Sequence, residues 1–305
     1  MSMADKPGQI WFDGKLVPWQ DAKIHVLTHG LHYGTGVFEG IRAYSTKKGP
    51  AIFRLQDHVA RLFDSLKILN MHIDFDQDTI IAAIIAVIRA NKLQAAYIRP
   101  ICFYGDDALG ISVKGIRTHV AIAAWEWDAY LGADAIKNGI KAEVSSFSRP
   151  HINSAMTKAK VTGHYINSVL AHQQAQASGY QEAILLDTQG YVAEGSGENI
   201  FLVSKNELYT PMLSSCLAGI TRGSVITFAQ ELGIGIVERN ISRDELYTAD
   251  EVFFTGTAAE ITPICSIDDR QVGSGKPGPI TQQLQQLFFA CVHNTTEKHS
   301  QWLTF

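Results

Sequence analysis

The chain has 305 residues, of which 46% are hydrophobic and 18% are charged, and its formal net charge is -4 at pH 7. This composition is typical of a soluble globular protein and excludes a wholly disordered chain. The small negative charge and the lack of a basic stripe argue against nucleic-acid binding. A chain of this length is better accommodated by two hydrophobic cores than by one, so two domains are expected.

No targeting segment or membrane span is predicted. The polar stretch over residues 1–9 lacks the apolar core of a secretion signal. The most apolar run, at residues 80–88, is too short to span a bilayer. The 4 cysteines have no CxxC spacing and the 11 histidines are scattered, so reduced, mostly buried thiols, a cytoplasmic location and no metal site are expected.

The first half of the chain has the pattern of a small α+β domain with an antiparallel sheet. An Asp13-Gly14 turn signal joins the first two strands, and the helices are predicted from apolar residues at helical spacing. In chain order, the predicted elements are strands at residues 10–12 and 14–19, a strand late in residues 29–44, helices at 55–69 and 80–88, and strands at 97–104 and 119–125.

The second half alternates strands and helices after a connection at residues 132–139, which is predicted as the linker between domains at residues 1–131 and 140–305. Ser242 and Glu245 have the spacing of a capping box. The predicted elements are strands at residues 140–146, 183–187, 191–193, 199–203 and 251–255, and helices at 163–178, 221–232 and after Ser242.

Lys160 is the first candidate for chemistry, because lysine forms imines with carbonyls when its neighbours lower its pKa. It stands at the start of a predicted helix, where the positive end of the helix dipole disfavours a second positive charge. A free amine at this position could also shuttle a proton. Lys158 has no comparable pattern around it and is interpreted as a solvated surface amine.

Glu194 is the candidate partner for a cofactor ring. It follows a predicted hairpin strand and precedes Gly195 and Gly197, which allow the backbone to approach a flat ring closely. A carboxylate beside a pyridine nitrogen raises the pKa of that nitrogen and keeps it protonated. Glu198 either lies near the cofactor or makes a structural hydrogen bond to backbone, and Asn199 is interpreted as turn-forming.

A phosphate group needs N–H donors and positive charge. Residues 219–221 stand just before a predicted helix, where backbone N–H groups and the helix dipole favour an anion. Residues 256–257 offer another N–H group and a hydroxyl. Arg61 and Arg54 compete as the source of charge, because a guanidinium fork fits phosphate oxygens and neither is distinguished by its spacing.

These motifs occur together in one known family. The runs 160–165, 194–201 and 256–263 resemble the fold-type IV pyridoxal-phosphate enzymes. From residues 10–12 to 288–289, the chain resembles the bacterial branched-chain amino-acid aminotransferases. The resemblance implies an α+β, two-domain fold, with a small α/β-sandwich N-terminal domain and a larger C-terminal domain that has a β-barrel-like core. It also implies pyridoxal 5'-phosphate as the cofactor.

By this resemblance, Lys160 is the catalytic residue that carries the cofactor as a Schiff base, and Tyr165 faces the phenolic oxygen of the cofactor. The run at residues 53–62 is similar to the family around its phosphate arginine, which favours Arg61 over Arg54. The cofactor-binding residues implied by the resemblance are Arg61, Lys160, Tyr165, Glu194, Glu198, Leu217, Gly219, Ile220, Thr221, Gly256 and Thr257.

The aromatic residues resemble the walls of the family's apolar side-chain pocket, and Arg99 resembles the residue that helps to recognise a second, acidic substrate. Backbone N–H groups at residues 257–258 would hold the substrate α-carboxylate. The substrate-binding residues implied by the resemblance are Tyr33, Phe38, Gly40, Tyr97, Arg99, Trp127, Tyr130, Thr257 and Ala258.

The resemblance implies reversible transamination between L-leucine, L-isoleucine or L-valine and 2-oxoglutarate by a ping-pong cycle. The partners would be amino acids and 2-oxo acids, with no nucleic acid and no membrane. Family members place Tyr33 and its loop at a neighbouring subunit's site, which implies a homo-oligomer, either a dimer or a hexamer, with active sites near the dimer interface. The alternative is another fold-type IV reaction, either D-amino-acid transamination or that of aminodeoxychorismate lyase, although residues 97–100 and 127–131 argue against both.

Overall fold

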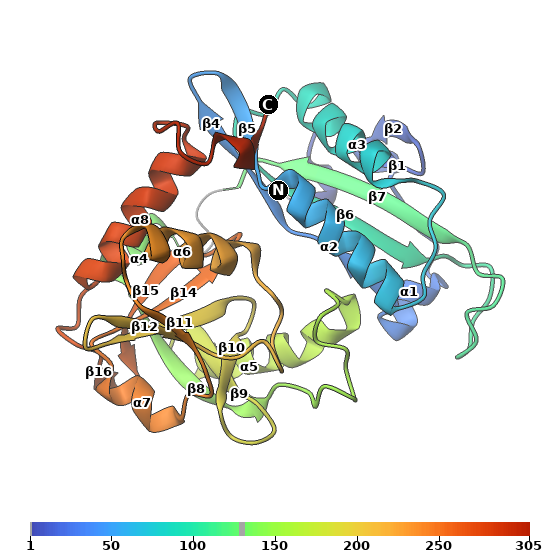
Figure 1. The fold of residues 1–305 in the computed structure, drawn as a ribbon. Coiled ribbons are helices and arrows are strands. Elements are labelled where there is room, and N and C mark those ends of the chain that lie inside the picture. Colours follow the sequence, from blue (N-terminus) through green and yellow to red (C-terminus); the bar gives the residue numbers. More distant parts are fainter. Residues whose placement is uncertain (1, 128–131) are drawn as a thin grey trace. The chain divides into compact units, whose positions relative to one another are not determined.

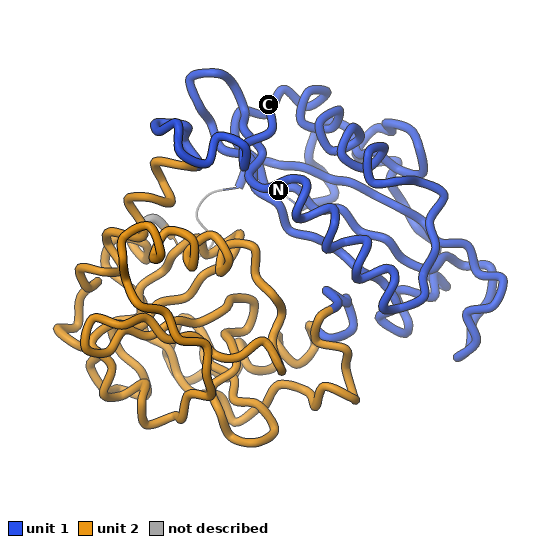
Figure 2. Tube along the Cα trace, in the orientation of Figure 1, with its two compact units in different colours: residues 1–127, 159–164, 292–305 blue, residues 128–158, 165–291 orange. Residues whose placement is uncertain are grey.

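The computed structural model describes residues 2–127 and 132–305, and the chain divides into two compact units. Unit 1 comprises Met1–Trp127, Ala159–His164 and Val292–Phe305, whereas unit 2 comprises Asp128–Lys158 and Tyr165–Cys291 (Figure 2). Two segments from the C-terminal half of the chain therefore belong to unit 1. Lys160 lies in the first of these segments.

Unit 1 is built on an antiparallel sheet with the strand order β17-β5-β4-β6-β7-β1-β2, and β3 also pairs with β6. The predicted hairpin at its edge is confirmed, because Asp13 and Gly14 join β1 to β2 and both have positive φ, as a two-residue hairpin turn requires. The strands are β1 (Gln9–Phe12), β2 (Lys15–Pro18), β3 (Gly36–Phe38), β4 (Ile41–Thr46), β5 (Gly49–Phe53), β6 (Ala96–Tyr104), β7 (Thr118–Trp125) and β17 (Leu303–Thr304).

Two long helices, α2 (Leu55–Ile68) and α3 (Gln77–Ala90), cover one face of this sheet (Figure 1). Both helices were predicted from their apolar spacing, and their apolar stripes pack against inward-facing sheet residues such as Ile98 and Val120. Fully burying one apolar side chain of this size, such as isoleucine or valine, contributes about 1.5–3 kcal/mol to the stability of the fold. α3 begins earlier than its apolar pattern, because Asp76 caps it by accepting a hydrogen bond from the Thr79 N–H at 2.8 Å.

Unit 2 contains a second sheet, with the order β10-β9-β8-β15-β14-β11-β12-β13 and β16 paired to β15, which curls into an open half-barrel (Figure 1). β8 runs parallel to β9 and β15, and β12 runs parallel to β13, while the other pairs are antiparallel. The strands are β8 (Ile140–Ser148), β9 (Glu182–Leu186), β10 (Val192–Gly195), β11 (Asn199–Ser204), β12 (Glu207–Thr210), β13 (Ile236–Glu238), β14 (Glu251–Gly256), β15 (Glu260–Ile267) and β16 (Arg270–Gln271).

The remaining helices include one whose start depends on a distant strand. The Glu251 carboxylate on β14 accepts hydrogen bonds from the N–H groups of Ile280 and Thr281, at 3.0 and 2.7 Å, and so caps α8. The capping box of Ser242 and Glu245 is confirmed at α7. These helices are α1 (His29–Tyr33), α4 (Ala133–Asn138), α5 (Tyr165–Ala177), α6 (Ile220–Glu231), α7 (Arg243–Thr248) and α8 (Pro279–Val292), with 3-10 turns at Met3–Asp5, Trp19–Asp21, Thr162–His164 and Ser300–Trp302.

The cysteines behave as packing residues. All are free, and Cys102, Cys216 and Cys291 are buried. Burial raises the pKa of Cys102 and of Cys216 to about 12, so neither forms a reactive thiolate near neutral pH. In the part of the chain that the structure describes, no helix has the length and apolar character needed to cross a bilayer.

Candidate active site

The predicted site residues are divided between the two units. Unit 1 contains Lys160, Arg61 and most residues predicted to contact the substrate side chain, whereas unit 2 contains Tyr165, Glu194 and the predicted N–H donors for phosphate. Tyr130 lies outside the described residues. Within each unit, the residues form a defined local arrangement.

The backbone of Lys160 is fixed on both sides within unit 1. Its carbonyl accepts a hydrogen bond from the Phe38 N–H at 3.0 Å, at the end of β3. Its own N–H donates to Ser65 Oγ at 3.0 Å, and the fully buried Ser65 hydroxyl donates to the Arg61 carbonyl on α2 at 2.9 Å. The Lys160 ammonium lies over the Phe38 ring, 5.0 Å from its centroid. The amine is therefore presented from a backbone held between β3 and α2.

The expectation that Lys160 begins a helix is wrong. α5 begins at Tyr165, and the residues between the two form a 3-10 turn at Thr162–His164. Because the effect of a helix dipole is confined to the terminal turn, it does not account for a reactive amine at Lys160. The positive charges of Arg61 and Lys160 both contribute to lowering the pKa of the buried His58.

A buried cluster of Glu39, His58 and Arg61 lies beside this segment and was not predicted from the sequence. Glu39 Oε1 accepts from Arg61 Nε at 2.7 Å, and Glu39 Oε2 accepts from Arg61 Nη2 at 2.9 Å and from His58 Nδ1 at 2.7 Å. Burial raises the pKa of Glu39, but the Arg61 charge and the hydrogen bonds outweigh burial and hold the pKa well below its ordinary value. Burial lowers the pKa of His58 despite Glu39, so a neutral imidazole donates to an ionised carboxylate.

Several residues predicted for the substrate pocket contact one another in unit 1. The Arg99 guanidinium carbon lies 4.6 Å from the Phe38 ring centroid and 5.2 Å from that of Tyr97. Arg99 Nη2 donates to the Tyr97 hydroxyl at 3.0 Å, and the Trp127 ring meets the Tyr97 ring edge-on at 4.4 Å. A Cβ at Gly40 would lie 2.1 Å from the Tyr97 hydroxyl, so a larger residue here would force the Tyr97 side chain to shift. One cation is thus held among aromatic rings.

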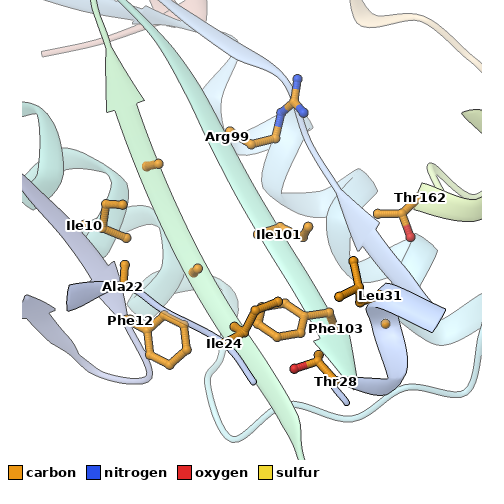
Figure 3. Close-up of a pocket in the computed structure, with 13 residues that line it drawn as sticks. Ile10, Phe12, Ala22, Ile24, Thr28, Leu31, Arg99, Ile101, Phe103 and Thr162 are labelled. Atoms are coloured by element: carbon orange, nitrogen blue, oxygen red, sulfur yellow. The ribbon is translucent and has the colours of Figure 1, made fainter. Parts of the chain in front are cut away.

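A largely apolar cavity of about 390 Å³ lies next to this group, and Arg99 is the one predicted site residue that lines it (Figure 3). Its walls come from β1, β6 and β7, from α1 and the segment before it, and from Thr162. The apolar side chains that line it include Ile10, Phe12, Ile24, Leu31, Ile101 and Phe103. Unit 1 therefore contains a cavity that is lined by one arginine and by mainly apolar side chains.

Tyr33 does not join the Phe38 group in unit 1. It lies on α1 with 44% of its surface exposed. The buried His29 ties α1 to a second loop, because its Nε2 donates to the Gly110 carbonyl at 2.8 Å while its Nδ1 lies 2.7 Å from Thr35 Oγ1. Exposed apolar residues lie in and around both segments, and the set is called here the α1 surface: Ile24, Val26, Leu27, Leu31, Tyr33, Leu109, Ile111 and Val113.

Glu194 is a buried carboxylate near the end of β10 in unit 2. Arg149 Nε lies 2.8 Å from Glu194 Oε1, although the angle makes this an ion pair rather than a hydrogen bond. The Leu217 N–H donates to Glu194 Oε2 at 3.3 Å, and Asn199 Nδ2 reaches the same oxygen at 3.5 Å. Arg149 was missed in the sequence, where its only signal is an arginine immediately before Pro150. These contacts fix the orientation of the carboxylate.

The turn after Glu194 is tightly packed around glycines. Glu198 Oε2 accepts from the Gly197 N–H at 3.0 Å, which is the backbone hydrogen bond considered for Glu198 from the sequence. Asn199 is not a turn residue as predicted, because it begins β11 and its side chain donates to the Leu217 carbonyl at 2.9 Å. A Cβ at Gly219 would lie 1.9 Å from Asn199 Oδ1, so the Leu217 loop can approach only with glycine there.

The predicted phosphate donors lie at the N-terminus of α6 and after β14, and these two elements pack together in unit 2. Gly219 caps α6 without any side-chain hydrogen bond, so the first N–H groups at Ile220 and Thr221 can donate to an anion. Gly256 ends β14 and Thr257 follows it. Nearby in sequence, Thr255 Oγ1 is buried without a hydrogen-bond partner among the described residues. Backbone N–H groups at the start of a helix can bind an anion such as phosphate.

Comparison with known proteins identifies the family of the chain. The pattern of the family described as amino-transferase class IV matches residues 36–267. The branched-chain-amino-acid aminotransferase of Pseudomonas aeruginosa is 55% identical over 304 residues, covering 100% of this chain and 99% of the relative. That of Escherichia coli K12 is 50% identical over 300 residues, covering 98% of this chain and 97% of the relative.

Solved structures also match almost the whole chain. The crystal structure of the Escherichia coli branched-chain amino acid aminotransferase has a TM-score of 0.96 and 49% identity, covering 98% of this chain and 99% of that chain. The branched-chain amino acid aminotransferase from Thermobaculum terrenum, solved in its PLP-form, has a TM-score of 0.92 and 36% identity, covering 98% of each chain. The chain therefore belongs to the class IV aminotransferase family.

Proposed function

We propose that this chain is a pyridoxal-phosphate-dependent aminotransferase that moves the amino group of L-leucine, L-isoleucine or L-valine reversibly to 2-oxoglutarate. Full-length relatives at 50% and 55% identity carry the name of this activity. The observation that carries the proposal is Arg99 held among Phe38 and Tyr97. A substrate site built from these three residues can accept an aliphatic side chain and, in the second half of the cycle, a side-chain carboxylate.

The described residues fit pyridoxal phosphate. The uncapped N-terminus of α6 and the buried, unpartnered Thr255 Oγ1 suit an anion, as does the guanidinium group of Arg61. The oriented carboxylate of Glu194 suits a protonated pyridine nitrogen. When bound, the cofactor supplies an aldehyde that condenses with primary amines and a ring that accepts the electron pair released at the substrate Cα.

The roles of the protein groups follow from their chemistry. Lys160 supplies the primary amine for the cofactor aldehyde and moves a proton at the substrate Cα. Tyr165 binds the phenolic oxygen, and Glu194 holds a proton at the pyridine nitrogen. Glu198 supports the turn that follows Glu194. The residues that would bind the phosphate, as the family resemblance implies, are Arg61, Leu217, Gly219, Ile220, Thr221, Gly256 and Thr257.

The substrate side chain is bound by the aromatic group around Arg99 in unit 1. Phe38, Tyr97 and Trp127 contact the aliphatic side chain, and Gly40 leaves room for the Tyr97 hydroxyl. Arg99 binds the distal carboxylate of glutamate or 2-oxoglutarate. Backbone N–H groups of Thr257 and Ala258 would bind the α-carboxylate, and the family resemblance adds Tyr130, which lies outside the described residues, to the substrate-binding set.

The experiment that tests the function is a stopped-flow half-reaction of the purified, cofactor-loaded protein with single amino acids. L-leucine, L-isoleucine, L-valine and L-glutamate should each change the visible absorbance of the bound cofactor, whereas D-alanine should not. Aminodeoxychorismate should yield no pyruvate. Turnover of D-alanine or of aminodeoxychorismate in preference to L-leucine would reject the proposal in favour of another class IV reaction.

We also infer that the active form is a homo-oligomer, at least a dimer, in which Tyr33 serves the neighbouring copy. Support comes from the α1 surface, where Ile111 is 89% exposed and lies in a loop that His29 holds against α1. Sedimentation should show a dimer or a hexamer, and Ile111→Asp should shift it toward the monomer. A wild-type monomer at micromolar concentration would reject this inference.

The cytoplasm is the proposed location. It is supported by the free, mostly buried cysteines, which are typical of a reducing compartment. Fractionation of expressing cells should recover the protein with cytoplasmic markers, and recovery with an exported fraction would contradict this location.

A further inference from the structure

Glu39 occupies an unusual position for a charged residue. It lies between Phe38 and Gly40, where β3 gives way to β4, and its backbone N–H donates to the Pro100 carbonyl at 2.9 Å. Its side chain is fully buried and reaches α2, where it contacts Arg61 and His58. Burying a carboxylate costs free energy, and here the contacts with Arg61 and His58 offset that cost. Because an apolar residue would pack at this position without such contacts, we expect Glu39 to have a role in those contacts.

The contact between Glu39 and Arg61 defines the orientation of the guanidinium group. Glu39 engages the side-on edge of Arg61, formed by Nε and Nη2, with one carboxylate oxygen on each nitrogen at 2.7 and 2.9 Å. Because the guanidinium group is planar, fixing Nε and Nη2 also fixes the direction of Nη1, which makes neither of these two contacts with Glu39. An arginine held in this way loses less conformational freedom when it binds an anion.

His58 fixes the carboxylate in turn. Its Nδ1–H donates to Glu39 Oε2 at 2.7 Å, the same oxygen that accepts from Arg61 Nη2. The imidazole is neutral, so the cluster consists of one negative and one positive charge. Glu39 therefore does not strengthen the local positive potential and instead partly cancels that of Arg61. A contribution of Glu39 to anion binding must come from orientation.

We propose that Glu39 is a positioning residue, which holds the Arg61 guanidinium in the orientation needed for the phosphate of the cofactor. This inference rests on the phosphate-binding role of Arg61 proposed above. It makes a counterintuitive prediction. Removal of the negative charge of Glu39 should weaken phosphate binding, whereas a purely electrostatic contribution would strengthen it.

The test compares pyridoxal phosphate with pyridoxal, which lacks the phosphate. The full-length protein is freed of cofactor and titrated with each compound, and binding is followed by visible absorbance. Glu39→Gln should weaken the affinity for pyridoxal phosphate about tenfold or more, as expected for loss of a hydrogen-bonded charge, and change that for pyridoxal less than twofold. Arg61→Gln should give the same selective loss. Glu39→Gln added to Arg61→Gln should have little further effect, since the two act through one contact.

Glu251→Gln is the matched control, because Glu251 is also a buried carboxylate with several hydrogen bonds but lies in unit 2 at the start of α8. It should lower stability without changing the ratio of the two affinities. If Glu39→Gln does not fold, Glu39→Asp keeps the charge but is one methylene too short for both nitrogens of Arg61. It should show the same phosphate-selective loss.

The outcomes separate this inference from the proposed function. Equal losses for both compounds, or unchanged or tighter binding of pyridoxal phosphate by the Glu39 variants, would overturn the positioning role. If Arg61→Gln is selective and the Glu39 variants are not, only the inference about Glu39 fails. If Arg61→Gln itself leaves the affinity for pyridoxal phosphate unchanged, the role of Arg61 fails together with the inference.

Discussion

Replacement of Arg99 by leucine should convert a dual-substrate site into one that handles only apolar side chains. The guanidinium group of Arg99 donates to Tyr97 and lies over the rings of Phe38 and Tyr97. Leucine retains the aliphatic bulk and removes the cation. Loss of a charged hydrogen-bond partner costs about 2–3 kcal/mol, so kcat/KM for L-glutamate should fall about 30- to 150-fold.

L-leucine should be affected less than about threefold, because its side chain makes no charged contact. The loss of two cation–π contacts, each about 0.5–1 kcal/mol, should lower the free energy of unfolding by about 1–2 kcal/mol. Stopped-flow half-reactions with the two amino acids measure the first effect, and denaturant unfolding measures the second.

Arg54→Leu provides the matched control for Arg99→Leu. Arg54 also lies over an aromatic ring, with its guanidinium carbon 4.8 Å from the Trp302 centroid, and it pairs with Asp57 at 2.6 Å. It should lose comparable stability but keep the ratio of glutamate to leucine activity. The reasoning is refuted if Arg99→Leu reduces both half-reactions equally, or if glutamate turnover survives intact.

Three further predictions concern single positions. Lys160→Ala should abolish the visible absorbance of the bound cofactor and lower kcat by at least about a thousandfold, and an unchanged spectrum would reject the assignment of this lysine. Gly40→Ala should reduce kcat/KM for L-leucine about tenfold or more, because the new Cβ would lie 2.1 Å from the Tyr97 hydroxyl, whereas an unaffected enzyme would show that Tyr97 moves freely. Burial lowers the pKa of His58 from its ordinary 6.5, so the unfolded chain binds the additional proton and stability should fall as the pH drops below 6.5. His58→Gln should make the free energy of unfolding, measured with denaturant, depend less on pH in this range. An unchanged slope would show that His58 is not the group responsible.

Local patterns are sufficient for much of the fold. The helices α2 and α3 follow from apolar spacing, and the capping box at Ser242 follows from two residues three positions apart. The β1–β2 hairpin follows from the Asp13-Gly14 turn. Each of these signals acts over a few residues, so the sequence alone is enough to place them.

Long-range contacts account for what the sequence did not predict. α8 has its N-terminal N–H groups satisfied by Glu251, a residue on a distant strand, so no cap is visible near Pro279. Glu39 meets Arg61 only after β3 and α2 have packed, and Arg149 meets Glu194 only after β8 and β10 have formed. Motifs marked Lys160 and Glu194 as candidates, whereas Glu39 and Arg149 carry no local signature in the sequence.

The path of the chain around Lys160 has a consequence for how the protein is made. The segment Ala159–His164 belongs to unit 1, although the chain enters it from Lys158 and leaves it toward Tyr165, both in unit 2. The last strand of the unit 1 sheet, β17, pairs with β5 and is contributed by Leu303 and Thr304. During ribosomal synthesis, residues 1–127 consequently emerge before both the segment that contains Lys160 and the edge strand β17. The sheet of unit 1 can therefore gain this edge only after residues 303–304 have been synthesised.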